Sequence, residues 1–111
     1  MKHPEIMKLK ALAELLLDHK LLHLRQAADA KTQSEQALVR LSQPVAEAEG
    51  LAGATAALTN LAYQRWADQR RAEINQGLAR QTHLWMEARD AAKIAFSKAE
   101  ALRGLAQKQS R

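Results

Sequence analysis

Apolar and small residues recur every three or four positions along almost the whole chain, and this spacing is interrupted once, at residues 42–55. Such spacing places the residues on one side of an α-helix, and its persistence over many turns is typical of a coiled coil. The interruption contains Pro44, which disfavours helix at the residue before it and removes a hydrogen bond from the helical ladder. Gly50 and Gly53 follow. We therefore predict an all-α fold, an antiparallel two-helix coiled-coil hairpin with a Pro/Gly hinge near residues 42–55.

The composition supports helices and excludes an all-β or α/β fold. The chain has 111 residues, room for one domain, and 23 of them are alanine, the strongest helix former. Only two valines, three isoleucines and 4% aromatic residues are present, whereas strands favour β-branched and aromatic side chains. We expect one domain over residues 1–111, with helix 1 at about 4–41, the hinge at 42–55 and helix 2 at about 56–108.

The two predicted helices differ in length. Pro4 suits a first helical turn, where its missing N–H costs nothing, and Thr55 is a plausible N-cap for helix 2. At 1.5 Å per residue the helices measure about 55 Å and about 80 Å. If the end of helix 1 lies level with the start of helix 2 at the hinge, the C-terminal segment from about residue 95 extends beyond helix 1.

Each helix has a seam of residues expected to face the other helix. In helix 1 the seam comprises Ile6, Leu9, Ala13, Leu16, Lys20, His23, Ala27, Ala30, Ser34, Ala37 and Leu41. In helix 2 it comprises Ile74, Leu78, Gln81, Trp85, Ala88, Ala92, Ala95, Ala99, Leu102 and Ala106. Alanine at successive seam positions lets two backbones approach closely. Gly77, inside this pattern, marks a bend or a close contact.

Residues 9–24 are apolar on more than one side of their helix. Leucines at 12, 15, 17, 21, 22 and 24 stand beside the predicted seam. A helix with several apolar faces usually has more than one neighbour. We therefore expect a protein partner or a homo-oligomer at this segment.

Charge, cysteine content and the length of apolar stretches indicate where the protein is located and which functions are excluded. Residues 1–54 carry seven basic and seven acidic side chains, while residues 55–111 carry ten and five, so the net charge of +5 belongs to the second half. There is no cysteine for a disulfide or a thiol nucleophile. The longest apolar stretch, residues 11–24, is too short and too charged to span a membrane. We also find no signal peptide, and we expect a soluble cytoplasmic protein.

Aromatic and basic residues alternate on helix 2 and form the candidate partner-binding site. Tyr63, Trp66 and Arg70 share one face, with Arg71 beside them, and Trp85 precedes Arg89 by four residues. Trp and Arg are enriched among the residues that dominate binding energy at interfaces. Trp66 lies off the seam and is the stronger candidate. Trp85 lies on the seam, where it is expected to fill a packing layer opposite smaller residues.

The sequence gives little support for a metal site, a catalytic site or a nucleic-acid-binding site. His19 and His23 have the i, i+4 spacing of metal ligands, but no third ligand follows, so we expect no metal. No catalytic constellation and no phosphate-binding loop is present, and we expect neither enzymatic activity nor a cofactor. Basic residues interleaved with aromatics would indicate nucleic-acid binding. Only residues 66–71 approach that pattern, and Asp68 and Glu73 interrupt it.

Helix 2 resembles the C-terminal half of the FliJ/YscO-type proteins of flagellar and type III secretion export. The resemblance runs from Tyr63 to Gln109 and rests on Arg65-Trp66, Ile74, Trp85 with Arg89, and the run Ala95-Phe96-x-Lys98-x-Glu100-x-Leu102. It implies a small cytoplasmic helical hairpin that acts as a stalk. Such a stalk enters the ring of the export ATPase and contacts the export gate, as the central rotor subunit does in ATP synthases. By this resemblance Trp66, Arg70, Trp85 and Arg89 are partner contacts.

The sequence thus predicts a non-enzymatic coiled-coil interaction protein, a stalk or adaptor of an export apparatus that binds its ATPase. In this hypothesis the leucine-rich segment and the basic face of helix 2 both engage protein partners. The alternative is a basic helical hairpin associated with nucleic acid.

Overall fold

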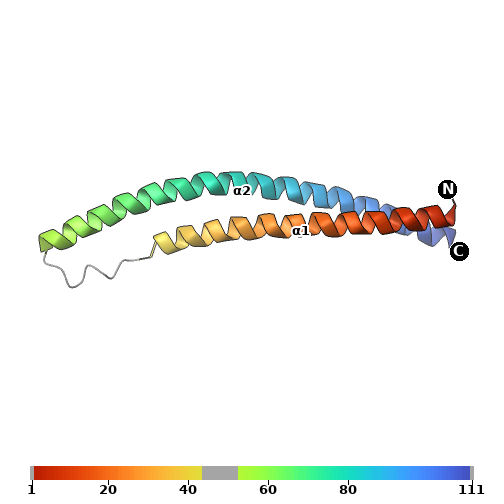
Figure 1. The fold of residues 1–111 in the computed structure, drawn as a ribbon, viewed down its shortest axis with the longest axis horizontal. Coiled ribbons are helices and arrows are strands. Elements are labelled where there is room, and N and C mark those ends of the chain that lie inside the picture. Colours follow the sequence, from red (N-terminus) through yellow and green to blue (C-terminus); the bar gives the residue numbers. More distant parts are fainter. Residues whose placement is uncertain (1, 44–52, 111) are drawn as a thin grey trace.

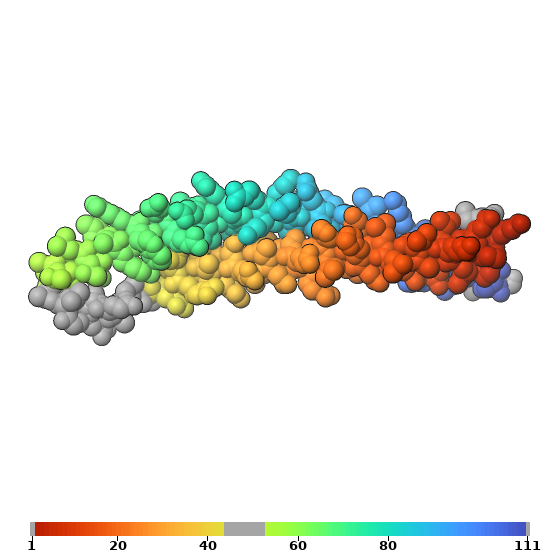
Figure 2. Space-filling view, in the orientation of Figure 1, coloured from red at the N-terminus to blue at the C-terminus, as the bar shows by residue number. Residues whose placement is uncertain are grey.

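Two long helices packed side by side make up the protein, as the seams predict. The computed structural model describes residues 2–43 and 53–110, and within them α1 spans His3–Leu41 and α2 spans Gly53–Gln109. The helices run antiparallel, so the two chain ends lie at the same end of the molecule (Figure 1). The result is a rod of 82 × 21 × 14 Å with its helices in contact along its length (Figure 2). The predicted all-α hairpin is confirmed.

The helix ends follow local chemistry. Lys2 precedes α1 in an extended conformation, and Pro4 lies in the first turn, where a missing N–H is tolerated. Glu5 lies in the same turn, next to the positive end of the helix dipole. At the other end the Ser42 hydroxyl donates a hydrogen bond to the carbonyl of Leu38 at 3.0 Å.

The predicted start of helix 2 is wrong by a few residues. α2 begins at Gly53, so Thr55 lies inside the helix and cannot be its N-cap. The alanine-rich sequence around Thr55 explains the earlier start, because alanine has the highest helix propensity. Most of the predicted hinge, residues 44–52 with Pro44 and Gly50, lies outside the described residues.

The predicted C-terminal overhang is also wrong. The Ser34 hydroxyl donates a hydrogen bond to Oε1 of Gln81 at 2.5 Å, and Glu14 pairs with Arg103 at 3.7 Å. At this register the start of α1 lies level with the end of α2, near the two chain termini (Figure 1). At the other end of the rod, the N-terminal end of α2 projects beyond the end of α1 (Figure 1). The prediction assumed that the end of α1 lies level with the start of α2. The eleven residues between the helices reach up to about 40 Å when extended, so the connection does not enforce that alignment.

The core between the helices is narrow and consists largely of alanine. Among the described residues seven are buried: Ile6, Ala67, Ile74, Ala92, Ala95, Ala99 and Ala106. Five of the seven are alanine, as the predicted seam of α2 requires. No polar or charged residue of the described part is buried.

The seam of α1 differs from the predicted one at some of its positions. The seam residues that repeat every seven positions face α2 as predicted: Ile6, Ala13, Lys20, Ala27, Ser34 and Leu41. Between these positions, however, Leu17 and Leu24 are half-buried, whereas Leu16 and His23 are exposed. Both choices satisfy a three–four spacing, and the structure places leucine instead of histidine at the inner position.

In the part of the chain that the structure describes, neither helix combines the length and the apolar character that a membrane span requires.

Candidate partner-binding surfaces

Three of the predicted site residues come together near the end of α1. Tyr63 and Trp66 pack with their ring centroids 5.7 Å apart. Together with Arg70 they line a shallow hollow of about 340 Å³. The other lining residues are Ile74 from α2 and Ala37, Arg40 and Leu41 from α1. We call this surface the aromatic end.

Trp66 is the most accessible aromatic ring of the aromatic end. It remains 55% exposed, although it has α1 on one side and Arg70 beside it. The spacing explains this exposure, because Trp66 precedes the buried Ala67 by one residue and so points away from the seam. An exposed tryptophan bordered by arginines is the composition found at interface hot spots.

The arginines of the aromatic end already contact carboxylates. Arg70 pairs with Glu73 at 3.2 Å, and Arg71 pairs with Asp68 at 2.8 Å. Both pairs lie on the surface, where such contacts contribute about 0–1 kcal/mol. A partner carboxylate can therefore exchange with them at little cost. The Arg40 Nε donates a hydrogen bond to the carbonyl of Gln36 at 3.4 Å, which holds the start of this side chain on α1.

Trp85 and Arg89 form a separate cluster. The guanidinium of Arg89 lies 5.2 Å from the centroid of the Trp85 ring, and Nζ of Lys31 lies 5.5 Å from the same centroid. Two cations thus contact one half-buried indole, and one of them comes from α1. Trp85 lies 19 residues after Trp66, or about 28 Å along the helix, so the structure does not bring the two tryptophans together.

Arg89 also borders a groove that the sequence reasoning did not find. Leu17, Leu21 and Leu24 of α1 and Phe96 of α2 give this groove an apolar wall, and Arg89 and Lys93 give it a basic rim. Its volume is about 540 Å³. We call it the basic groove. The leucines around residues 17–24 indicated an apolar surface on α1. Only the register of α1 against α2 shows which residues of α2 lie beside them.

The paired histidines do not gain a third ligand. The rings of His19 and His23 meet edge to face with centroids 5.0 Å apart. Within residues 2–43 and 53–110, no three His, Cys, Asp or Glu side chains are grouped so that they could hold a metal ion.

No known protein family, no curated protein and no solved structure matches this chain.

Proposed function

We propose that this chain is a non-enzymatic interaction protein, a stalk or adaptor of a flagellar or type III export apparatus that binds its ATPase. The observation that carries the proposal is the aromatic end, where the exposed Trp66 and Tyr63 lie beside arginines at the end of α1. An aromatic anchor with a basic rim fits a protein surface that combines apolar and acidic groups.

The shape of the molecule supports a stalk. The rod is 82 Å long and only 21 Å wide, so it can reach into a ring-shaped assembly through a narrow opening. The aromatic end lies beside the end of α1, in the half of the rod that is away from both chain termini (Figure 1). A partner bound there would leave the rest of the rod accessible to a second protein, as the resemblance to export stalks implies.

The basic residues favour protein over nucleic acid. Arg70, Arg71, Arg89 and Arg103 of α2 each contact a carboxylate of the same helix. A phosphate backbone would meet these fixed carboxylates together with the arginines, and their repulsion would offset part of the attraction on which phosphate binding depends.

The test is direct binding of the purified chain to a purified export ATPase. We expect the Trp66→Ala/Arg70→Ala variant to bind at least about tenfold more weakly, because truncating a hot-spot tryptophan typically costs 2 kcal/mol or more. Arg80→Ala is the matched control, because it removes an exposed arginine of α2 outside the aromatic end. Circular dichroism checks that both variants stay helical.

Three results would contradict the proposal: no binding by the wild-type chain, equal binding by the double variant, or an equal loss in the control. Retardation of DNA with a steep dependence on salt would instead favour the nucleic-acid hypothesis. Genes for motility or secretion beside the gene for this chain would independently support the export role.

A further inference from the structure

The hairpin leaves an unusual amount of apolar surface uncovered. Its radius of gyration is 24.7 Å, against about 13 Å for a compact domain of this length. Its accessible surface is 8353 Å², against about 6,100 Å² for a compact protein of this mass. The described core contains only two side chains larger than alanine, Ile6 and Ile74. Small scaffolds with so little core usually gain stability from an added chain or a crosslink, and this chain has no cysteine.

Part of the uncovered apolar surface lies on one side of the rod. We call this side the leucine face, and its large members are Leu9, Leu12, Leu16, Leu84, Ile94 and Leu105. Leu16 and Ile94 line one shallow depression across the two helices. Leu9 and Leu12 share the side of Leu16 because they precede it by seven and four residues. The leucine face lies opposite the basic groove, since Ile94 and Phe96 are two residues apart and point about 160° apart on the helix.

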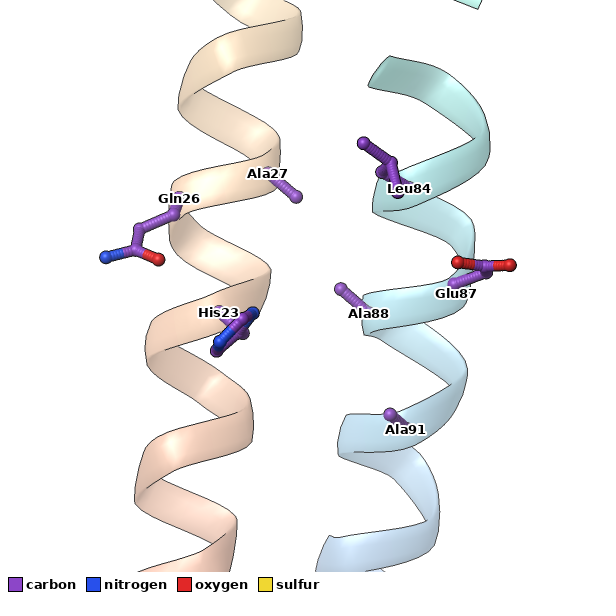
Figure 3. A pocket seen from close by; sticks show the side chains of 7 residues that line it. All are labelled: His23, Gln26, Ala27, Leu84, Glu87, Ala88 and Ala91. Carbon is purple, nitrogen blue, oxygen red and sulfur yellow. The ribbon is translucent and has the colours of Figure 1, made fainter. Parts of the chain in front are cut away.

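A hollow interrupts the leucine face farther along the rod (Figure 3). It measures about 510 Å³, and three alanines, Ala27, Ala88 and Ala91, contribute to its lining. Ala27 and Ala88 point toward each other across it, while Gln26 and Glu87 point outward (Figure 3). The leucine face therefore carries both the protruding Leu12 and Leu16 and a hollow whose lining includes three alanines beside His23 and Leu84.

We propose that two copies of this chain dock through their leucine faces as an antiparallel four-helix bundle. An isologous interface must be self-complementary. The leucine face meets this condition because it carries both protruding leucines and a hollow that can receive a side chain. Leu16 lies about 16 Å along the rod from the hollow at Ala27, and Leu12 lies about 22 Å from it. Two rods running in opposite directions, with the two-fold axis near Ile94, place Leu16 of each copy over the hollow of the other. Rods running in the same direction would place leucines on leucines.

The extent of the leucine face suits a stable dimer. From Leu84 to Leu105 it is about 32 Å long. With the 21 Å width of the rod it offers about 650 Å² per copy, or about 1,300 Å² in total, which lies within the range of specific interfaces. The charged residues in its central depression are Lys20 and Lys98. Their long stems can cover apolar surface while the ammonium groups reach the rim. In this arrangement Lys98 comes within about one helical turn of Glu87 of the second copy.

The first experiment measures the mass of the chain by light scattering over a concentration series. We expect a wild-type dimer of twice 12.3 kDa, and at least about tenfold weaker dimerisation for Ile94→Lys, since a charge would be buried in the interface. Phe96→Lys is the matched control on the opposite side of α2. The two side chains are almost equally exposed, at 58% and 55%, and the control should dimerise like the wild type.

A monomeric wild-type chain would overturn the proposal, and so would equal dimerisation by the two variants. Circular dichroism at high concentration checks that both variants remain helical. Binding of an ATPase at the aromatic end does not require the leucine face, so this result is independent of the proposed function.

The second experiment tests the antiparallel arrangement. In Leu16→Cys/Ala27→Cys, the two cysteines of one chain lie about 16 Å apart on a helix, too far for an internal disulfide. Mild oxidation should therefore link two chains. Asp18→Cys/Asp29→Cys has the same spacing on the outer side of α1, where both aspartates are exposed, and should yield much less covalent dimer. Equal crosslinking of the two variants would overturn the antiparallel docking.

Discussion

The two halves of this rod are held together in different ways. In the terminal half, residues 3–24 of α1 pack on residues 88–109 of α2, and this half contains Ile6 and four of the five buried alanines. In the hinge half, residues 25–41 pack on the facing part of residues 53–87, where Ala67 and Ile74 are buried. Polar contacts also join the helices there: Ser34 with Gln81, and Lys31 over Trp85. Small side chains give a close contact with little apolar burial. Larger polar and aromatic side chains leave a basic, accessible surface, and the aromatic end lies there.

The largest expected effect comes from enlarging an alanine in the terminal half. Ala99 is 0% exposed, so Ala99→Phe forces the helices apart and should lower the free energy of unfolding by about 1–3 kcal/mol. Urea denaturation followed by circular dichroism measures this loss at a fixed chain concentration. The matched control is Ala57→Phe in the hinge half, at an exposed position of α2. Equal losses in the two variants would show that the alanine seam does not determine the packing.

The next effect concerns a glycine in the hinge half. A Cβ added at Gly77 would meet only Nη2 of Arg80, at 4.0 Å. Of the two expectations from the sequence, a bend or a close contact, the close contact is therefore not there. Alanine favours helix over glycine by about 1 kcal/mol. We expect Gly77→Ala to raise the free energy of unfolding by about that amount. Gly104→Ala in the terminal half also has open space and should give a similar gain. A loss at Gly77 would mean that the helices approach more closely there.

The smallest expected effect is that of the ion pair across the terminal half. Glu14→Gln removes the contact with Arg103 at 3.7 Å. Exposed pairs contribute about 0.2–1 kcal/mol, and salt screens them, so the loss should be small at low salt and absent in 1 M salt. Glu35→Gln breaks a pair within one helix, with Lys31 at 2.7 Å, and serves as the comparison. A loss that persists at high salt would indicate packing by the Glu14 stem instead of its charge.

Much of the fold could be predicted because the helices depend on local signals. The three–four spacing and the alanines of residues 88–106 predicted which side of α2 is buried, and Ala92, Ala95, Ala99 and Ala106 are buried. The seam of α1 was less certain in advance, because its leucines are spread over several faces and permit two rotations of the helix. The site residues were chosen by type and spacing alone. Which residues of α1 lie beside them, such as Leu41 in the same hollow as Tyr63, depends on the register of the two helices.

Taken alone, the sequence determined that this chain forms two long helices, that they fold back once and that alanine lines much of their contact. These properties follow from helix propensity, from proline and glycine at one place, and from the period of the apolar residues. The tertiary structure decided the register of the two helices and therefore which end projects. Register depends on contacts between residues far apart in the chain, such as Ser34 with Gln81, and neighbouring residues carry no information about them. The structure also decided that leucines border the contact between the helices on opposite sides of the rod, at the leucine face and at the basic groove.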